Sequence, residues 1–146
     1  MARLQLDNWL PWALLSAVFA ALTAIFAKVG VENVNSDLAT LIRTVVILVV
    51  VSAIVAVTGQ YRPLGLIAPR TYLFLVLSGL ATGASWLCYF RALKLGDAAR
   101  VAPIDKLSVV LVAVFGVAFL GEKLSLREWS GVALVAAGAV VIAWTG

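Results

Sequence analysis

Five uncharged, largely apolar runs divide the chain, and the charged residues are confined to the segments between them. The runs cover residues 8–27, 44–61, 71–90, 107–121 and 129–146. A helix needs about 20 residues to cross a hydrocarbon core about 30 Å thick, and three of the runs are long enough or nearly so. The second and fourth are best completed backwards into the charged segments before them. The predicted membrane helices are about 9–29, 38–58, 71–93, 101–121 and 128–145.

This extension places three charged residues, Arg43, Asp105 and Lys106, inside helices and not in loops. The apolar runs are continuous, whereas an outer-membrane barrel has alternating strands of about ten residues. The pattern therefore predicts an all-α membrane protein, a bundle of five transmembrane helices that forms a single domain over residues 1–146.

Composition strengthens the membrane interpretation. Hydrophobic residues make up 64% of the chain, against roughly 45–50% in a soluble domain. With no histidine and one cysteine, the chain alone builds no zinc or iron–sulfur site, and we expect no metal and no cofactor. The formal charge of +4 comes from scattered residues that leave no basic face for nucleic acid. The expected partner is the lipid bilayer.

Small residues recur within the apolar runs. The third helix carries Gly79-x-x-x-Gly83, and the fifth carries Gly131 and Gly138 one heptad apart. Small residues let helix backbones approach closely in lipid. The pattern fits a specific dimer interface, but ordinary packing inside one bundle is favoured because small residues are common in all membrane helices.

Five spans place the two termini on opposite sides of the membrane, but the charges do not orient them. The N-terminal side carries five Lys and Arg residues and the other side six, or five if the deeper Arg43 is set aside. The positive-inside rule therefore gives no orientation. One interpretation is dual topology, in which two copies pair as an antiparallel homodimer and form the inverted repeat that many transporters use. The other is a single orientation set by local features.

Charged residues from four helices gather toward the side opposite the N-terminus. Charges inside a membrane usually face the bundle interior or a water-filled cavity. Here Asp105 is a candidate proton or substrate site, and an Arg43–Asp105 pair fits their similar depth. Arg43 and Arg91 would attract an anionic group, and Trp86 would form an aromatic cavity wall. The candidate pathway residues are Asp105, Arg43, Lys106, Arg91, Trp86 and Lys28.

A structural interpretation of the same residues stays open. Lys28, Arg91 and Lys106 can extend to the headgroups, and Trp86 can anchor against lipid. Asp105 falls in the first turn after Pro103, where the helix dipole favours a carboxylate. Adjacent residues on a helix point about 100° apart, so Asp105 and Lys106 are not expected to share a face.

Several short motifs resemble the repeat of EamA-type transporters in the drug/metabolite transporter superfamily. They are Ala92-Leu93-Lys94-Leu95-Gly96, Val101-Ala102-Pro103 and Leu120-Gly121-Glu122-Lys123-Leu124-Ser125, followed by Gly131 and Gly138. Trp12-Ala13-Leu14, Lys28 and Arg43 extend the resemblance over nearly the whole chain. Because the chain carries one repeat, it is most similar to the five-helix bacterial/archaeal transporter branch.

The resemblance implies a secondary transporter for a metabolite, amino acid or drug-like solute. It would act in the inner membrane as a homodimer, driven by protons or by exchange. Glu122 matches the family motif, and its place at a helix end beside Lys123 indicates a structural cap or gate and not a substrate ligand. Two other interpretations remain: a non-transporting membrane scaffold, and one subunit of a hetero-oligomeric transporter. An enzyme is not expected, because no nucleophile–base pair or metal cluster is visible.

Overall fold

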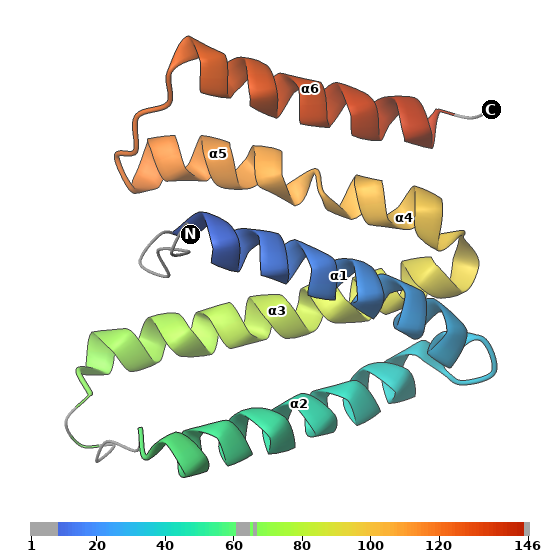
Figure 1. Ribbon diagram of the computed structural model, residues 1–146, viewed down its shortest axis with the longest axis vertical. Coiled ribbons are helices and arrows are strands. Elements are labelled where there is room, and N and C mark those ends of the chain that lie inside the picture. Colours follow the sequence, from blue (N-terminus) through green and yellow to red (C-terminus); the bar gives the residue numbers. More distant parts are fainter. Residues whose placement is uncertain (1–8, 61–64, 66, 145–146) are drawn as a thin grey trace, which may run out of the picture. The chain divides into compact units, whose positions relative to one another are not determined.

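Every regular element in the described part of the chain is helical. The computed structural model describes residues 9–60, 65 and 67–144. Residue 145 of the fifth expected helix lies outside them, as do Arg3, Asp7 and Arg62 from the orientation count. Figure 1 shows the helices in chain order, α1 (Trp9–Val31), α2 (Ser36–Thr58), α3 (Pro69–Leu95), α4 (Ala98–Asp105), α5 (Ser108–Phe119) and α6 (Leu126–Ala143).

Five segments are long and apolar enough to cross a membrane, with α4 and α5 together forming one of them, Ala98–Phe119. The predicted all-helical fold with five membrane spans is confirmed. Large apolar side chains are widely exposed along the spans; Leu80 of α3, for example, is 67% exposed. Water disfavours an apolar surface of this extent, whereas lipid accommodates it.

Polar residues fix both ends of α2. The Asn35 side chain accepts hydrogen bonds from the backbone amides of Asp37 and Leu38, at 2.8 and 3.4 Å, and so caps the N-terminus. At the other end Gly59 adopts a left-handed conformation with φ 65°. Its amide and that of Gln60 donate to carbonyls of the last turn, which is the Schellman arrangement that ends many helices.

The α5–α6 connection is also built by local chemistry. Gly121 follows α5 with φ 70°, a conformation that only glycine adopts without strain. Ser125 then caps α6 through a reciprocal pair of bonds. The Ser125 amide donates to Glu128 Oε2 at 2.7 Å, and the Glu128 amide donates to Ser125 Oγ at 3.4 Å. This capping box satisfies two amides that the helix start would leave unpaired.

The span Ala98–Phe119 is not one continuous helix. Between α4 and α5 each hydrogen bond spans three residues and not four. The Leu107 amide donates to Ile104 O at 3.0 Å, and the Val109 amide donates to Lys106 O at 3.0 Å. These are three-residue steps, typical of 3₁₀ geometry. The single helix expected over 101–121 is therefore divided, and Lys106 lies in the turn and not inside a helix, which corrects the sequence expectation.

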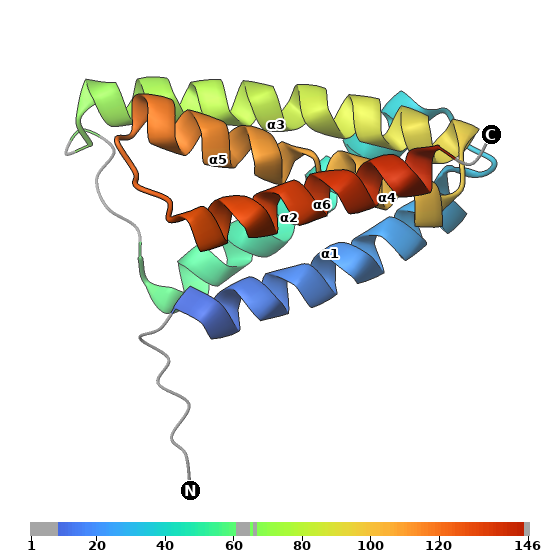
Figure 2. The same cartoon turned by 90° about the horizontal axis from the view of Figure 1, so that it is seen from above.

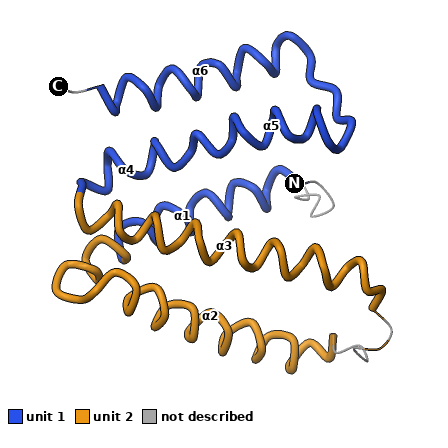
Figure 3. Tube along the Cα trace, turned by 180° about the vertical axis from the view of Figure 1, so that it is seen from behind, with its two compact units in different colours: residues 1–26, 96–146 blue, residues 27–95 orange. Residues whose placement is uncertain are grey.

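The chain divides into two compact units, coloured separately in Figure 3. Unit 1 comprises residues 1–26 and 96–146, and unit 2 comprises residues 27–95. Within unit 1, α6 returns alongside α5 and α4, as Figures 1 and 2 show. Within unit 2, α2 packs along α3. The last turn of α1 belongs to unit 2, where Val31 and Leu93 are almost completely buried.

The glycines singled out in the sequence lie on open helix faces. A Cβ added at Gly79, Gly83, Gly131 or Gly138 would meet no atom of another part of the described chain within 4 Å. Close packing of helices within the chain is therefore not found at these four positions. The small residues buried on α1 are Ala24 and Ala27. A dimer contact at the glycines stays a prediction.

Candidate functional site

An arginine lies stacked on aromatic rings between α2 and α3. The Arg43 Cζ lies 4.0 Å from the centroid of the Trp86 ring and 5.4 Å from that of Phe90. Arg43 and Trp86 are half-buried and Phe90 is buried. Both distances are within the range in which a ring face attracts a cation. We call these three residues the stacked-arginine site.

The site lies well inside the membrane-length helices. Arg43 is seven residues after the start of α2 at Ser36, or about 10 Å along the helix axis. Trp86 is nine residues before the end of α3 at Leu95, about 13 Å. Because α2 begins two residues earlier than expected, Arg43 lies farther from the start of its helix than the sequence indicated. Its charge has aromatic rings against it on a helix that is apolar enough to cross a membrane.

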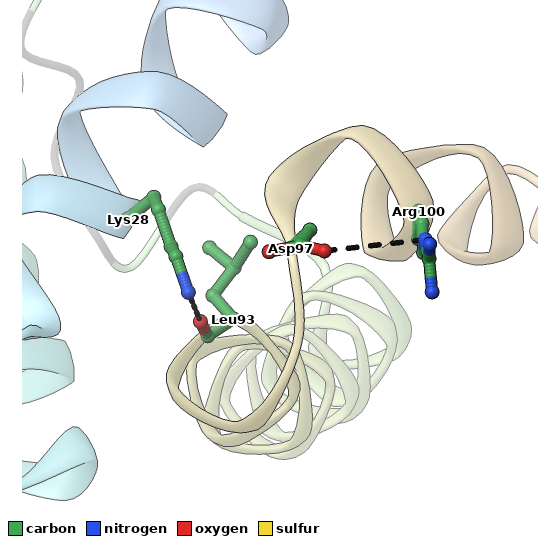
Figure 4. Close-up of polar contacts among 4 residues, drawn as sticks. All are labelled: Lys28, Leu93, Asp97 and Arg100. Carbon is green, nitrogen blue, oxygen red and sulfur yellow. Dashed lines mark hydrogen bonds and ion pairs between the residues drawn. The ribbon is translucent and has the colours of Figure 1, made fainter.

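Two lysines of unit 2 bind backbone carbonyls. Lys28 Nζ donates to Leu93 O at 2.8 Å, as Figure 4 shows, and Lys94 Nζ donates to Val34 O at 2.6 Å. Leu93 lies in the last turn of α3, whose final carbonyls have no partner within the helix. A cation at that end also complements the helix dipole. Lys28, a candidate pathway residue, thus joins α1 to α3.

Arg91, another candidate, follows Phe90 on α3, and its side chain is exposed. Its position one residue after the buried Phe90 directs it to a different side of the helix. Of the candidates in unit 2, the structure brings Arg43 and Trp86 together and gives Lys28 a separate partner. A pathway role for Arg91 stays a prediction.

Asp105 and Lys106 contact each other at the α4–α5 turn. Lys106 Nζ lies 3.3 Å from Asp105 Oδ2, with side chains 54% and 36% exposed. Adjacent positions on a helix point in different directions, but the lysine side chain is long enough to fold back onto the carboxylate. Both residues belong to unit 1 and Arg43 to unit 2, so the Arg43–Asp105 pair stays a prediction.

The first turn of α4 carries a second, more exposed pair. Arg100 Nε lies 3.9 Å from Asp97 Oδ2, shown in Figure 4, and both side chains are more than half exposed. An exposed pair of this kind contributes little to stability. Asp97 and Arg100 therefore belong to a solvated helix end, unlike the half-buried Asp105.

Glu122 folds back on the end of α5. Its amide donates to Gly116 O at 3.1 Å. A Cβ added at Gly116 would lie 2.5 Å from Glu122 Oε2, so the glycine leaves room for the carboxylate. Together with the left-handed Gly121, this geometry gives Glu122 a structural position at the helix end. Among the described residues, Glu122 takes part in neither of the two ion pairs.

Sequence reasoning missed two residues that shape these contacts. Phe90 is the second ring beside Arg43, and its spacing of four residues from Trp86 places both on one helix face. Gly116 makes room for Glu122, and its signal is a lone glycine within an apolar helix just before the Leu-Gly-Glu turn. In the described residues, no group of three His, Cys, Asp or Glu side chains could hold a metal ion.

Five membrane-length helices, lipid-compatible surfaces and ionisable residues within the spans define a multi-pass membrane protein. The chain belongs to the EamA-like transporter family, whose model matches residues 7–144. It is also 72% identical over 137 residues to a protein of Sinorhizobium sp that is named as an uncharacterized transporter in the cobO 3′ region. The match covers 94% of this chain and 97% of the relative. No solved structure matches the chain significantly. The predicted family is confirmed, and family and relative support a transporter role.

Proposed function

We propose that this chain is a secondary transporter that moves a small organic solute across the inner membrane as a homodimer, driven by protons or by exchange. The observation that carries the proposal is the divided span Ala98–Phe119, with Asp105 and Lys106 at its turn. Discontinuous membrane helices form the substrate and ion sites of many secondary transporters. An ionisable residue at such a break is a functional residue by default.

Asp105 is the residue we assign to proton coupling. Asp105 is the last residue of α4 and is half-buried. Its carboxylate contacts Lys106, which takes part in no other ion pair among the described residues. Gain of a proton at Asp105 would break this ion pair, and loss of the proton would restore it. Either event would change the turn. The residues we propose for the substrate or proton pathway are Arg43, Trp86, Arg91 and Lys28 of unit 2 and Asp105 and Lys106 of unit 1.

The transport test uses purified chain in liposomes that contain a trapped pH-sensitive dye. A proton gradient is imposed, and neutral, cationic and anionic small solutes are supplied in turn. We expect Asp105→Asn to abolish pH-driven flux while the protein stays folded. Asp97→Asn is the matched control, because its exposed carboxylate pairs, among the described residues, with the exposed Arg100. Full flux in Asp105→Asn liposomes would refute the assignment of Asp105.

A folded chain that moves no solute by itself would favour one of two other functions. The chain would then be a membrane scaffold, or one subunit of a hetero-oligomeric transporter. Adding a second five-helix chain of opposite orientation separates them, because flux returns only for the hetero-oligomer.

The homodimer is tested through orientation. The exposed Cys88 is replaced, and a single cysteine is added at the C-terminus. Intact cells are then labelled with an impermeant thiol reagent. Partial labelling that becomes complete on permeabilisation indicates both orientations and supports an antiparallel homodimer. Labelling of all molecules, or of none, before permeabilisation contradicts the antiparallel arrangement.

A further inference from the structure

We infer that the stacked-arginine site binds an anionic oxygen group of the transported solute, which places the substrate among small carboxylates or phosphates. The inference rests on the proposed transport function and adds the chemical class of the substrate. It starts from the geometry of Arg43. The guanidinium Cζ lies over the Trp86 ring, 4.0 Å from its centroid, so the ring covers one side of the guanidinium. A stacked guanidinium keeps its N–H donors along the edge, where they match a carboxylate or phosphate.

Unit 2 supplies no acidic partner for these donors. Its sequence carries two carboxylates, Glu32 and Asp37, which lie before α2 and in its first turn. Within the described residues of unit 2, the Arg43 side chain contacts the two rings and interacts electrostatically with Tyr89, but it makes neither an ion pair nor a hydrogen bond. The Asp37 carboxylate instead accepts a hydrogen bond from Ser36 Oγ at 3.2 Å.

The hydroxyl groups near Arg43 on α2 are already engaged. Thr40 Oγ1 donates to Ser36 O at 2.9 Å, and Thr44 Oγ1 donates to Thr40 O at 2.8 Å. Lys28 and Lys94 donate to carbonyls at the end of unit 2 where α1 and α3 finish. Arg43 thus offers charged donors that no described group of unit 2 holds in an ion pair or a hydrogen bond. The site should recognise an oxygen anion through one bidentate group.

The charge of unit 2 also favours an anion. It carries six basic residues and two acidic ones, a formal net charge of +4, whereas unit 1 carries five of each. The whole net charge of the chain thus belongs to the unit that holds the stacked-arginine site. A charge inside the hydrocarbon region is costly unless it is paired, so an anion beside Arg43 offsets that cost.

A binding experiment with Trp86 as the reporter tests this inference. Trp9, Trp12, Trp129 and Trp144 are changed to Phe, which leaves Trp86 as the only indole. The full chain is placed in phosphatidylcholine vesicles, and acetate or inorganic phosphate is added at constant ionic strength. Binding is read from saturable changes in Trp86 emission, and independently from a rise in the thermal unfolding midpoint.

We expect saturable binding in the parent chain and binding at least about tenfold weaker in Arg43→Gln, since that variant loses the charge-assisted hydrogen bonds to the anion. Arg43→Lys should recover part of the affinity. Arg70→Gln is the matched control, because Arg70 is also an arginine beside an aromatic ring. Its Cζ lies 5.8 Å from the centroid of Phe74, and both residues are on α3. It removes an equal charge from the same unit, and binding should be unchanged.

Three outcomes would overturn the inference. The first is no binding by either readout in the folded parent chain. The second is equal loss in Arg43→Gln and Arg70→Gln, which indicates a general charge effect. The third is competition by phosphatidylglycerol, added in increasing fractions, which assigns Arg43 to a lipid headgroup. If liposomes still move neutral or cationic solutes in these cases, the transport proposal stands and only the anion class fails. If anions bind through Arg43 but no solute moves, transport fails and the site stands.

Discussion

The hydrogen bond from Lys28 to Leu93 O gives the most quantitative prediction. Lys28→Met keeps most of the apolar side chain and removes the ammonium group. Leu93 is 0% exposed, so its carbonyl would lose a partner in a place that water does not reach. A hydrogen bond to a charged group contributes about 1.5–3 kcal/mol, and an unsatisfied buried carbonyl costs about 1–3 kcal/mol. We expect the free energy of unfolding to fall by about 2 kcal/mol.

The assay is equilibrium unfolding in mixed detergent micelles, followed by circular dichroism at constant protein concentration. A change of 2 kcal/mol corresponds to about a 30-fold change in the unfolding equilibrium constant, which such curves resolve. Lys28→Arg keeps the charge and should lose much less. Because Lys28→Arg leaves the net charge unchanged, a small loss in this variant would show that a cation at position 28 is enough to keep the stability.

Lys94→Met provides a second comparison on the same unit. Lys94 also donates to a carbonyl, Val34 O at 2.6 Å, but this contact is exposed and water can replace the lysine. The loss in Lys94→Met should therefore be clearly smaller than that in Lys28→Met. Equal stability of Lys28→Met and the parent chain would refute the reasoning, and so would a larger loss in Lys94→Met.

Three further predictions concern helix ends, each measured in the same unfolding assay. Gly121→Ala should cost about 1–2 kcal/mol, because a Cβ strains the left-handed conformation at φ 70°, whereas Gly131→Ala in the open interior of α6 should be neutral or stabilising. Asn35→Ala should cost about 1 kcal/mol through loss of the α2 cap, and no change would contradict that cap. Gly116→Ala displaces the Glu122 carboxylate, so a double-mutant cycle with Glu122→Ala should give a coupling of at least about 0.5 kcal/mol; strict additivity would contradict the contact.

The five spans could be predicted because the contrast between apolar runs and charged segments is strong. The helix starts were harder to place. Helix α2 begins at Ser36 and α6 at Leu126, each two residues before the expected start. The residues responsible are the caps Asn35 and Ser125. Their polar side chains lower the local hydropathy, but they start the helices by accepting hydrogen bonds from backbone amides. An apolar profile carries no information on such bonds.

The division of Ala98–Phe119 was not predicted for a related reason. The step from four-residue to three-residue hydrogen bonds at Lys106 and Leu107 leaves hydropathy unchanged. The sequence pattern predicts Pro103 in the first turn of a helix, whereas α4 begins at Ala98 and holds Pro103 in its interior. Proline removes one amide donor within α4, and the chain tightens three residues later. The sequence thus indicates that the segment around Pro103 is unusual, but it does not indicate how the backbone turns there.

The candidate site was predictable as a set of residues but not as an arrangement. Arg43 and Trp86 were both named from their depth, yet their stacking depends on the register of α2 against α3. That register is set by side-chain packing between helices far apart in sequence. Phe90 went unnoticed because an aromatic residue in an apolar run has no distinctive signal until its neighbours are known.

The stacked arrangement explains how Arg43 is tolerated inside a span and why it is suited to a ligand that must leave again. Ring faces offset only part of the cost of a charge in hydrocarbon, with about 2 kcal/mol expected from a desolvated cation–π contact. A carboxylate of the protein held permanently against Arg43 would offset more, but it would also compete with any anionic solute. Unit 2 provides the aromatic faces, and its own carboxylates stand at the beginning of α2. The arginine is thereby positioned without being neutralised within its unit, which is the condition for binding an anion reversibly.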